Sequence, residues 1–208
     1  MVSVSILFFA CEKTSISDLS DLAMNPESTT NSQLNSLTIG QEYQGGVIFY
    51  IDETGKHGLI AAKQDLGPAP WGSFGATING ARSLDDGITN TKAILTNCNE
   101  PGIAARLCDE YVVRDNINKW KKYDDWFMPA FNQFTLIMQQ LKESCNFCDK
   151  HYWVSTEASG NFQAVPINSA NNTWRLSYSC SSQPGLFGLF FIPDSKTRAL
   201  FVRPIRAF

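Results

Sequence analysis

Histidine is scarce in this chain of 208 residues, and neither sign of charge dominates. Only His57 and His151 are present, and neither stands in a Ser/His/Asp or Cys/His catalytic pattern. Seventeen Lys and Arg against 20 Asp and Glu give a net charge of −3. Such a balance provides no electrostatic footprint for nucleic acid or for an anionic membrane surface. Composition therefore argues against a nucleic-acid partner.

Other signatures of catalysis are missing as well. The chain has no phosphate-binding glycine loop. Its acidic pairs, Asp85-Asp86 and Asp124-Asp125, are adjacent in sequence, and adjacent side chains on a strand point apart. They do not predict a carboxylate dyad. The basic stretch at 119–123 includes Trp120 and Tyr123, and it fits a solvated loop better than a site for a polyanion or a sugar.

The apolar run at the N-terminus is too short to span a bilayer, which takes roughly 20 residues. It ends in Phe8-Phe9-Ala10-Cys11. This ending resembles the lipobox of bacterial lipoproteins, where a small residue precedes the cysteine that is lipidated as the signal peptide is cleaved. We predict a signal peptide over residues 1–10, although a basic start is lacking, and lipidation of Cys11. The alternative is a buried strand that ends in an ordinary cysteine.

The segment after Cys11 has the composition of a tether. Residues 14–38 contain no aromatic residue, and thirteen of these 25 residues are Ser, Thr or Asn. Such a segment cannot bury enough apolar area to offset its ordering entropy. We predict a flexible tether over residues 11–38, followed by a folded head over residues 39–208. The anchor would place the head in the bacterial cell envelope, at the outer membrane or the cell surface.

The head contains nearly all of the aromatic residues: 23 of 25 follow residue 42. Residues 45–51 and 59–62 predict two strands of a hairpin, because both are apolar and a turn-rich segment separates them. Residues 126–128 predict a short buried strand, which Pro129 stops. Beyond it, apolar residues recur at helical spacing and predict a helix at the centre of packing: Phe131, Phe134, Ile137, Met138 and Leu141.

The remaining pieces alternate with turns. Two shorter helices are predicted, one over 91–98 and one after Pro101-Gly102. Residues 63–90 form a long loop that contains Trp71 and Phe74, and such a loop is usually functional or pinned by its own aromatic residues. Five late strands are predicted near residues 152–156, 164–167, 173–178, 186–192 and 199–205.

Seven segments occur in an order that resembles the Lcl C-terminal domain family, named for a collagen-like bacterial adhesin and otherwise of unknown function. They span residues 45–50, 58–62, 90–94, 104–108, 124–129, 152–157 and 202–208. That family is similar in turn to C-type-lectin-like domains. The resemblance implies an α+β fold with two or three helices packed on small, irregular antiparallel sheets, and with the chain ends close together.

The sequence departs from these patterns in two places. Ala130 stands where the family has a serine, which would cap the following helix. The calcium motifs of true C-type lectins are missing, and Gln183-Pro184-Gly185 lacks the carboxylate that such a site needs. We therefore expect no metal and no cofactor.

Cysteine placement suits an exported protein. Cys98 and Cys108 flank the predicted turn between two helices, so we predict a disulfide between them, worth roughly 3 kcal/mol in the chain-entropy model. Cys145 and Cys148 could close locally, or one of them could pair with Cys180. A zinc site formed by these three cysteines and His151 is the alternative, which an oxidising compartment disfavours.

The C-terminal segment 202–208 holds Arg203 and Arg206 in an otherwise apolar strand. We predict that at least one arginine is buried and paired with a carboxylate near the central segment: Asp124, Asp125 or Glu157. Outward-facing arginines on an edge strand are the alternative.

Ligand contact is expected on the late strands, because C-type-lectin-like domains commonly bind there. Aromatic rings beside amide and guanidinium donors suit a carbohydrate or a protein epitope. The candidates are Asn171, Asn172, Trp174, Arg175 and Tyr178, with Trp71 and Phe74 from the long loop; Trp174 is equally suited to a core role.

The sequence thus predicts a non-catalytic surface lipoprotein with a carbohydrate or protein ligand, which meets the membrane through its lipid anchor alone. Two alternatives stay open. One is an enzyme on the same fold, as in formylglycine-generating enzymes, and this rests on analogy of fold. The other is a structural surface protein without a small ligand.

Overall fold

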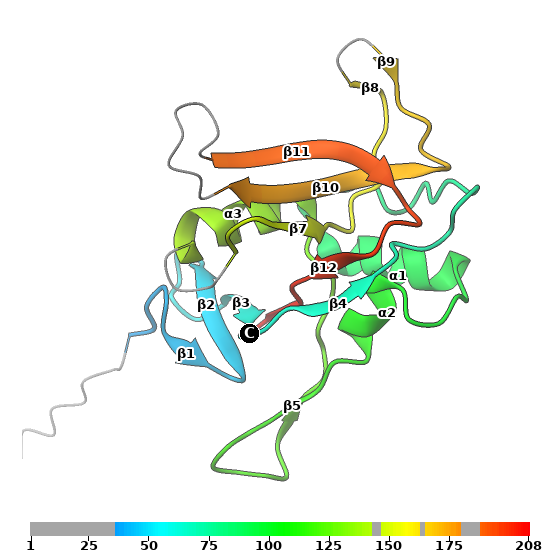
Figure 1. Cartoon of the computed structure of the whole chain (residues 1–208). Coiled ribbons are helices and arrows are strands. Elements are labelled where there is room, and N and C mark those ends of the chain that lie inside the picture. Colours follow the sequence, from blue (N-terminus) through cyan, green and yellow to red (C-terminus); the bar gives the residue numbers. More distant parts are fainter. Residues whose placement is uncertain (1–35, 143–146, 163–164, 180–187) are drawn as a thin grey trace, which may run out of the picture. The chain divides into compact units, whose positions relative to one another are not determined.

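The computed structural model describes residues 36–142, 147–162, 165–179 and 188–208, which all belong to one compact unit, Ser36–Phe208. Its class is α+β, as predicted: three described helices accompany several small sheets (Figure 1). The sheets are not all antiparallel, because β12 and β7 pair in parallel. Within the described ranges, no helix is long and apolar enough to cross a membrane.

The largest sheet joins the beginning of the head to its end. Its four antiparallel strands lie in the order β1 (Glu42–Tyr43), β2 (Gly46–Ile51), β3 (Gly58–Ala62) and β13 (Ile205–Ala207). The predicted hairpin of residues 45–51 and 59–62 is therefore confirmed. The rings of Tyr43 and Phe208 meet edge to face with their centroids 5.1 Å apart. The two ends of this unit are thus close together, as expected.

A second sheet is assembled from distant parts of the chain. Its order is β4 (Leu66–Ala69), β12 (Leu200–Val202) and β7 (Lys150–Trp153). Three two-stranded pairs complete the described sheets: β5 (Val113–Arg114) with β6 (Lys122–Tyr123), β8 (Asn161–Phe162) with β9 (Val165–Pro166), and β10 (Asn172–Ser179) with β11 (Gly188–Ser195). The last predicted strand is divided into β12 and β13, because the chain leaves one sheet at Arg203-Pro204 and enters the other.

The helices are α1 (Gly87–Asn97), α2 (Ala104–Asp109) and α3 (Phe131–Leu141). The predicted apolar stripe of α3 is confirmed, since Phe134, Ile137, Met138 and Leu141 are all buried. At its start Ala130 offers no side-chain cap. The hydroxyl of Thr156 instead accepts a hydrogen bond from the Phe131 N–H at 3.0 Å, so a distant residue satisfies one of the free donors that every helix start leaves.

The segment Trp126-Phe127-Met128 is not a regular strand, although it is the centre of packing that the sequence predicts. Phe127 makes a single antiparallel bridge, to Ile205. The ladder stops there because the backbone N–H and C=O of Met128 both bond to the Thr91 hydroxyl on α1. The three side chains enter three different apolar clusters. Consecutive residues thereby connect the whole core.

Candidate functional site

Both arginines of the C-terminal segment are paired, which confirms the prediction for Arg206 and extends it to Arg203. Arg206 binds the Asp125 carboxylate through Nε and Nη2 and donates to the Gln44 side chain at 2.7 Å. Its guanidinium lies 4.9 Å from the centre of the Tyr123 ring. Arg206 therefore fixes two side chains, Gln44 and Tyr123, that face a cleft.

Arg203 has a partner that the sequence did not suggest. It lies 2.6 Å from the Asp65 carboxylate, and the side chains of both residues are less than one-tenth exposed. Asp65 also binds Lys150 at 2.9 Å and accepts from the Tyr152 hydroxyl at 3.0 Å. Residue 65 belongs to the long loop, so its contact with residue 203 depends on tertiary structure that residue spacing does not encode.

The cleft has a volume of about 430 Å³ and lies where the start of the head, the beginning of the long loop and the β5–β6 hairpin meet. Gly45 is required at the junction: its φ is +89°, and a Cβ there would lie 2.9 Å from Val113 Cγ1. The lining residues are Glu42, Tyr43, Gln44, Gly45, Gly46, Lys63, Gln64, Tyr111, Val113, Arg114, Asp115, Asn116, Ile117 and Tyr123.

The cleft offers aromatic rings and hydrogen-bonding groups of both kinds. Three tyrosines contribute to its lining, and the Tyr123 hydroxyl donates to Asp115 Oδ2 at 2.9 Å. Lys63 and Glu42 form an exposed ion pair at 2.5 Å. Gln44, Gln64 and Asn116 add amide groups. This set of groups resembles the small number of placed polar groups among aromatic rings that is typical of ligand pockets.

Two titratable groups of the cleft, Tyr111 and Asp115, have pKa values shifted away from neutral pH. Burial raises the pKa of the Tyr111 hydroxyl, and the neighbouring Gln64 side chain partly offsets this. Hydrogen bonds from the backbone N–H groups of Asn118 and Ile117 lower the pKa of Asp115. Tyr111 therefore stays neutral and Asp115 stays charged. A general acid or base works best with a pKa near the working pH, so these two groups suit binding better than catalysis.

The structure does not place the sequence-predicted contact residues on one exposed surface. Trp71 is fully buried and donates its indole N–H to the Val154 carbonyl at 2.9 Å. Tyr178 is 8% exposed and lies in the core. Trp174 is half-buried, edge-on to Phe131. A surface contact role is therefore wrong for Trp71 and Tyr178.

The other predicted contact residues are more accessible but separate. Phe74 is 55% exposed. Asn171 and Asn172 are half-buried at the start of β10. Arg175 is largely covered, with its Nε 2.7 Å from Asp194 and its Nη1 2.8 Å from His151 Nδ1. Burial and the charge of Arg175 lower the pKa of His151. Ligand contact by these residues stays a prediction.

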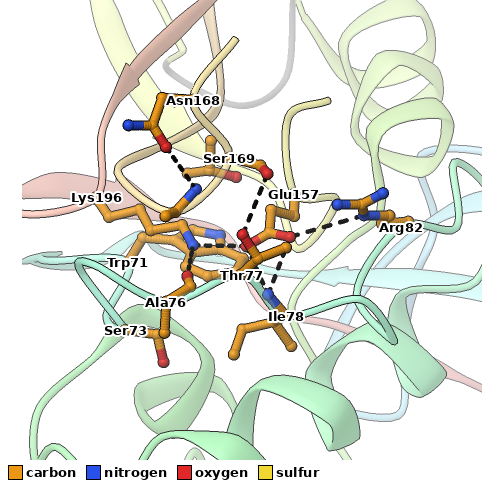
Figure 2. A network of polar contacts seen from close by, with 12 residues as sticks. Trp71, Ser73, Ala76, Thr77, Ile78, Arg82, Glu157, Asn168, Ser169 and Lys196 are labelled. Carbon is orange, nitrogen blue, oxygen red and sulfur yellow. Dashed lines mark hydrogen bonds and ion pairs between the residues drawn. The ribbon is translucent and has the colours of Figure 1, made fainter. Parts of the chain in front are cut away.

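A buried ion pair holds the long loop against the turn between β11 and β12 (Figure 2). Lys196 Nζ lies 2.6 Å from Glu157 Oε1, and neither side chain is exposed. Nζ also donates to the Ala76 carbonyl at 2.7 Å and sits 4.6 Å from the centre of the Trp71 ring. The Ile78 N–H donates to both Glu157 oxygens. Lys196, Glu157 and Trp71 together hold the long loop in place, and we call this network the loop anchor.

No sequence pattern predicted this network. Lys196 lies in the polar turn Ser195-Lys196-Thr197, where an exposed lysine is the normal expectation. Glu157 was one of three candidate partners for the C-terminal arginines; the guanidinium beside it is that of Arg82, which is 3.8 Å away and exposed. Burial lowers the pKa of Lys196, with Glu157 partly offsetting this effect. The pair fastens segments more than 100 residues apart, because Lys196 contacts Ala76 as well.

The predicted disulfide between Cys98 and Cys108 is absent. Both are free thiols, buried in one apolar cluster, where cysteine behaves as a small apolar residue. Burial raises the pKa of Cys108 well above its usual value, so this thiol is unreactive. Cys148 is disulfide-bonded, and a sulfur in a disulfide is not a zinc ligand. Cys145 and Cys180 lie outside the described residues. In the described part of the chain, no group of three or more His, Cys, Asp or Glu side chains is placed to hold a metal.

Comparison with known protein families and curated proteins identified no relative of this chain. No protein-family model matches the chain, and no curated protein matches it either. The functional argument therefore rests on the cleft.

Proposed function

We propose that this chain is a bacterial surface lipoprotein whose head is a C-type-lectin-like domain of the Lcl C-terminal type and binds a glycan, without catalysis. The cleft of residues 42–46, 63–64, 111, 113–117 and 123 carries the proposal. Its tyrosine rings can stack on the apolar faces of a sugar, and its amide and charged groups can pair with hydroxyls. The α+β class and the closeness of Tyr43 and Phe208 are consistent with such a domain.

The size of the cleft favours a glycan over a protein epitope. A stable protein interface buries about 800 Å² on each partner and usually involves 20–30 residues. The cleft is lined by 14 residues and encloses about 430 Å³. A short stretch of polysaccharide fits these dimensions. The cleft is lined by two acidic and two basic side chains, Glu42, Asp115, Lys63 and Arg114, whose charges balance beside neutral amides, and this suits a neutral or weakly charged sugar.

A glycan array with the whole chain tests this proposal. Gln64→Ala and Asn116→Ala remove exposed cleft amides that support no described core cluster. Each should weaken binding of the best glycan by about tenfold, a loss of about 1.4 kcal/mol. Asn172→Ala is the matched control, an amide on β10 outside the cleft.

The two outcomes separate the candidate surfaces. Loss of binding with Gln64→Ala and Asn116→Ala alone supports the cleft. Loss with Asn172→Ala alone would assign binding to the late strands, as the sequence first suggested. No glycan bound by the unmodified chain would contradict the proposal.

The proposed lipid anchor is tested separately, since Cys11 lies outside the described residues. Cys11→Ser removes the side chain to which the acyl chains would be attached, and stable anchoring takes more than one such chain. Membrane fractionation should therefore show a soluble protein or an unprocessed precursor. A protein that stays membrane-bound and processed as before would contradict lipidation there.

A further inference from the structure

The most exposed apolar side chains of the described head lie together at the tip of the β5–β6 hairpin. Ile117 is 97% exposed and Trp120 is 94% exposed, whereas the other exposed apolar residues of the described head reach 55% at most. In Figure 1 the hairpin that carries β5 extends away from the helices and from the other sheets. A tryptophan this exposed contributes almost no burial free energy to the folded head.

The tip is built to hold this conformation. Asp115 Oδ1 accepts hydrogen bonds from the backbone N–H groups of Ile117 and Asn118, both at 2.8 Å. Asn118 Oδ1 accepts from the Trp120 N–H at 3.2 Å. The backbone N–H of Asp115 donates to the Lys121 carbonyl at 2.9 Å and closes the loop. The two apolar side chains are therefore presented on an ordered turn.

Basic side chains surround the apolar tip. Residues 113–123 contain Arg114, Lys119, Lys121 and Lys122 and a single carboxylate, in a chain whose net charge is −3. That carboxylate, Asp115, is engaged in the turn and with the Tyr123 hydroxyl. Lys122 pairs with Asp124 at 2.6 Å, which neutralises part of the excess. The hairpin therefore carries a local excess of positive charge, although the net charge of the whole chain is negative.

We infer that this hairpin is a second membrane contact, in which Trp120 and Ile117 enter the interface of a bilayer with anionic lipids while Lys119 and Lys121 bind lipid phosphates. Tryptophan favours the membrane interface because its ring is apolar and its N–H needs a polar partner. Basic residues beside it add attraction to anionic headgroups. The hairpin shares Ile117 with the proposed glycan site, whereas Trp120, Lys119 and Lys121 do not line the cleft, so substitutions at these three residues test the membrane contact separately.

A bilayer fits this tip better than a protein partner does. Two side chains at the end of a hairpin are far fewer than the 20–30 residues of a standard protein interface. A membrane surface needs no matching shape, and it combines apolar depth with anionic charge, as the tip combines apolar and basic side chains. Binding of a protein at the tip is the alternative that the experiment must separate.

The experiment is a vesicle co-sedimentation assay with the full chain carrying Cys11→Ser, which removes the proposed lipidation site. The vesicles contain phosphatidylglycerol and phosphatidylcholine in equal parts, or phosphatidylcholine alone. We expect binding to the anionic vesicles that weakens as salt rises, since screening shortens the reach of the charges. Trp120→Ala should lower the partition coefficient by about tenfold, and Lys119→Ala and Lys121→Ala by about fivefold each.

Matched controls use exposed residues elsewhere in the head. Phe74→Ala removes an exposed ring from the long loop, and Lys56→Ala removes an exposed lysine from the β2–β3 turn; neither should change vesicle binding. Quenching of tryptophan fluorescence by brominated lipid gives a second readout. Trp71, Trp126 and Trp153 are buried, and Trp174 is half-buried on β10, away from the hairpin in Figure 1, so most of the quenching should disappear in Trp120→Phe.

Three outcomes would overturn the inference: no binding to anionic vesicles, binding that Trp120→Ala leaves unchanged, or a protein that cross-links through residue 120 in the absence of lipid. If glycan binding fails and vesicle binding follows the pattern above, the membrane contact stands and the proposed function does not.

Discussion

Two regions of the head combine a lysine, a glutamate and an aromatic ring, and they differ in burial. In the loop anchor, Lys196 and Glu157 are fully covered and Trp71 lies beneath the ammonium group. At the cleft, Lys63 and Glu42 pair at a similar distance, but their side chains are 45% and 70% exposed. The same residue types thus form a fixed support in one place and an open rim in the other.

The difference lies in what water can do for each charge. A buried charge that loses its partner keeps the full cost of desolvation, whereas an exposed one is solvated again at once. The anchor therefore has to remain paired for the long loop to stay in place. The cleft pair can separate and turn toward a ligand at little cost, which suits a binding site.

Removal of the anchor lysine should have the largest effect. Lys196→Met leaves Glu157 buried without its cation, and we expect the free energy of unfolding to fall by about 3–5 kcal/mol. Lys63→Met, the matched variant at the cleft, should cost no more than about 1 kcal/mol. Urea denaturation of both variants measures the difference. Equal losses would mean that burial does not distinguish the two pairs.

Arg206→Met should have an intermediate effect. Arg206 is 9% exposed but its partner Asp125 is 59% exposed, so the orphaned carboxylate would be solvated. We expect a loss of about 1–3 kcal/mol from the missing charged hydrogen bonds. Because Gln44 and Tyr123 lose their support, glycan affinity should fall further than stability does. Calorimetry of unfolding and of binding on one sample checks both; an intact affinity would separate this arginine from the cleft.

Tyr123→Phe should loosen the β5–β6 hairpin at the cleft and leave the packing of the core unchanged. The variant keeps the ring in the core and removes the hydroxyl that donates to Asp115. Asp115 is partly exposed, so water can replace this donor and the loss of stability should be small. Thermal unfolding should shift slightly, while amide exchange in residues 114–122 should become faster. Unchanged exchange in that hairpin would show that Asp115 is held by the backbone alone.

Acidification should produce the smallest change, and within the β5–β6 hairpin it should act through Asp115. The pKa of Asp115 is lowered from its usual 3.8, so the folded turn binds a proton less readily than the unfolded chain does. Its stabilising contribution is complete above pH 3.8 and is lost as the pH falls through the folded-state pKa. NMR shifts of the Ile117 and Asn118 amides should follow this titration. In Asp115→Asn the same shifts should stay flat, and a titrating signal there would exclude Asp115 as its source.

Local elements could be predicted from the sequence where a pattern is confined to one segment. The hairpin at 45–62 and the stripe of α3 follow from periodicity, and both are present. The hairpin and the helix depend on few distant contacts. The sequence also predicted that at least one C-terminal arginine is paired with a carboxylate, because two exposed arginines are unusual in an apolar strand, and Arg206 pairs with Asp125, one of the three candidates.

The site could not be predicted in the same way. Tyr43, Gln64 and Tyr111 are far apart in sequence and meet only because β1, the long loop and the β5–β6 hairpin converge. Trp71 was indistinguishable from a contact residue, because its burial depends on Lys196 more than 120 residues later. Cys98 and Cys108 were suitably spaced for a bridge, yet both thiols pack as apolar groups in the core.

The hydroxyl of Thr156 has a consequence for the order of folding. It accepts from the Phe131 N–H at the start of α3 and donates to the Ser83 carbonyl in the long loop at 2.7 Å. The first turn of α3 is therefore complete only after residues 83 and 156 have both docked on it. Nucleation of this helix is tied to long-range collapse, so loop, helix and strand should form in one cooperative step.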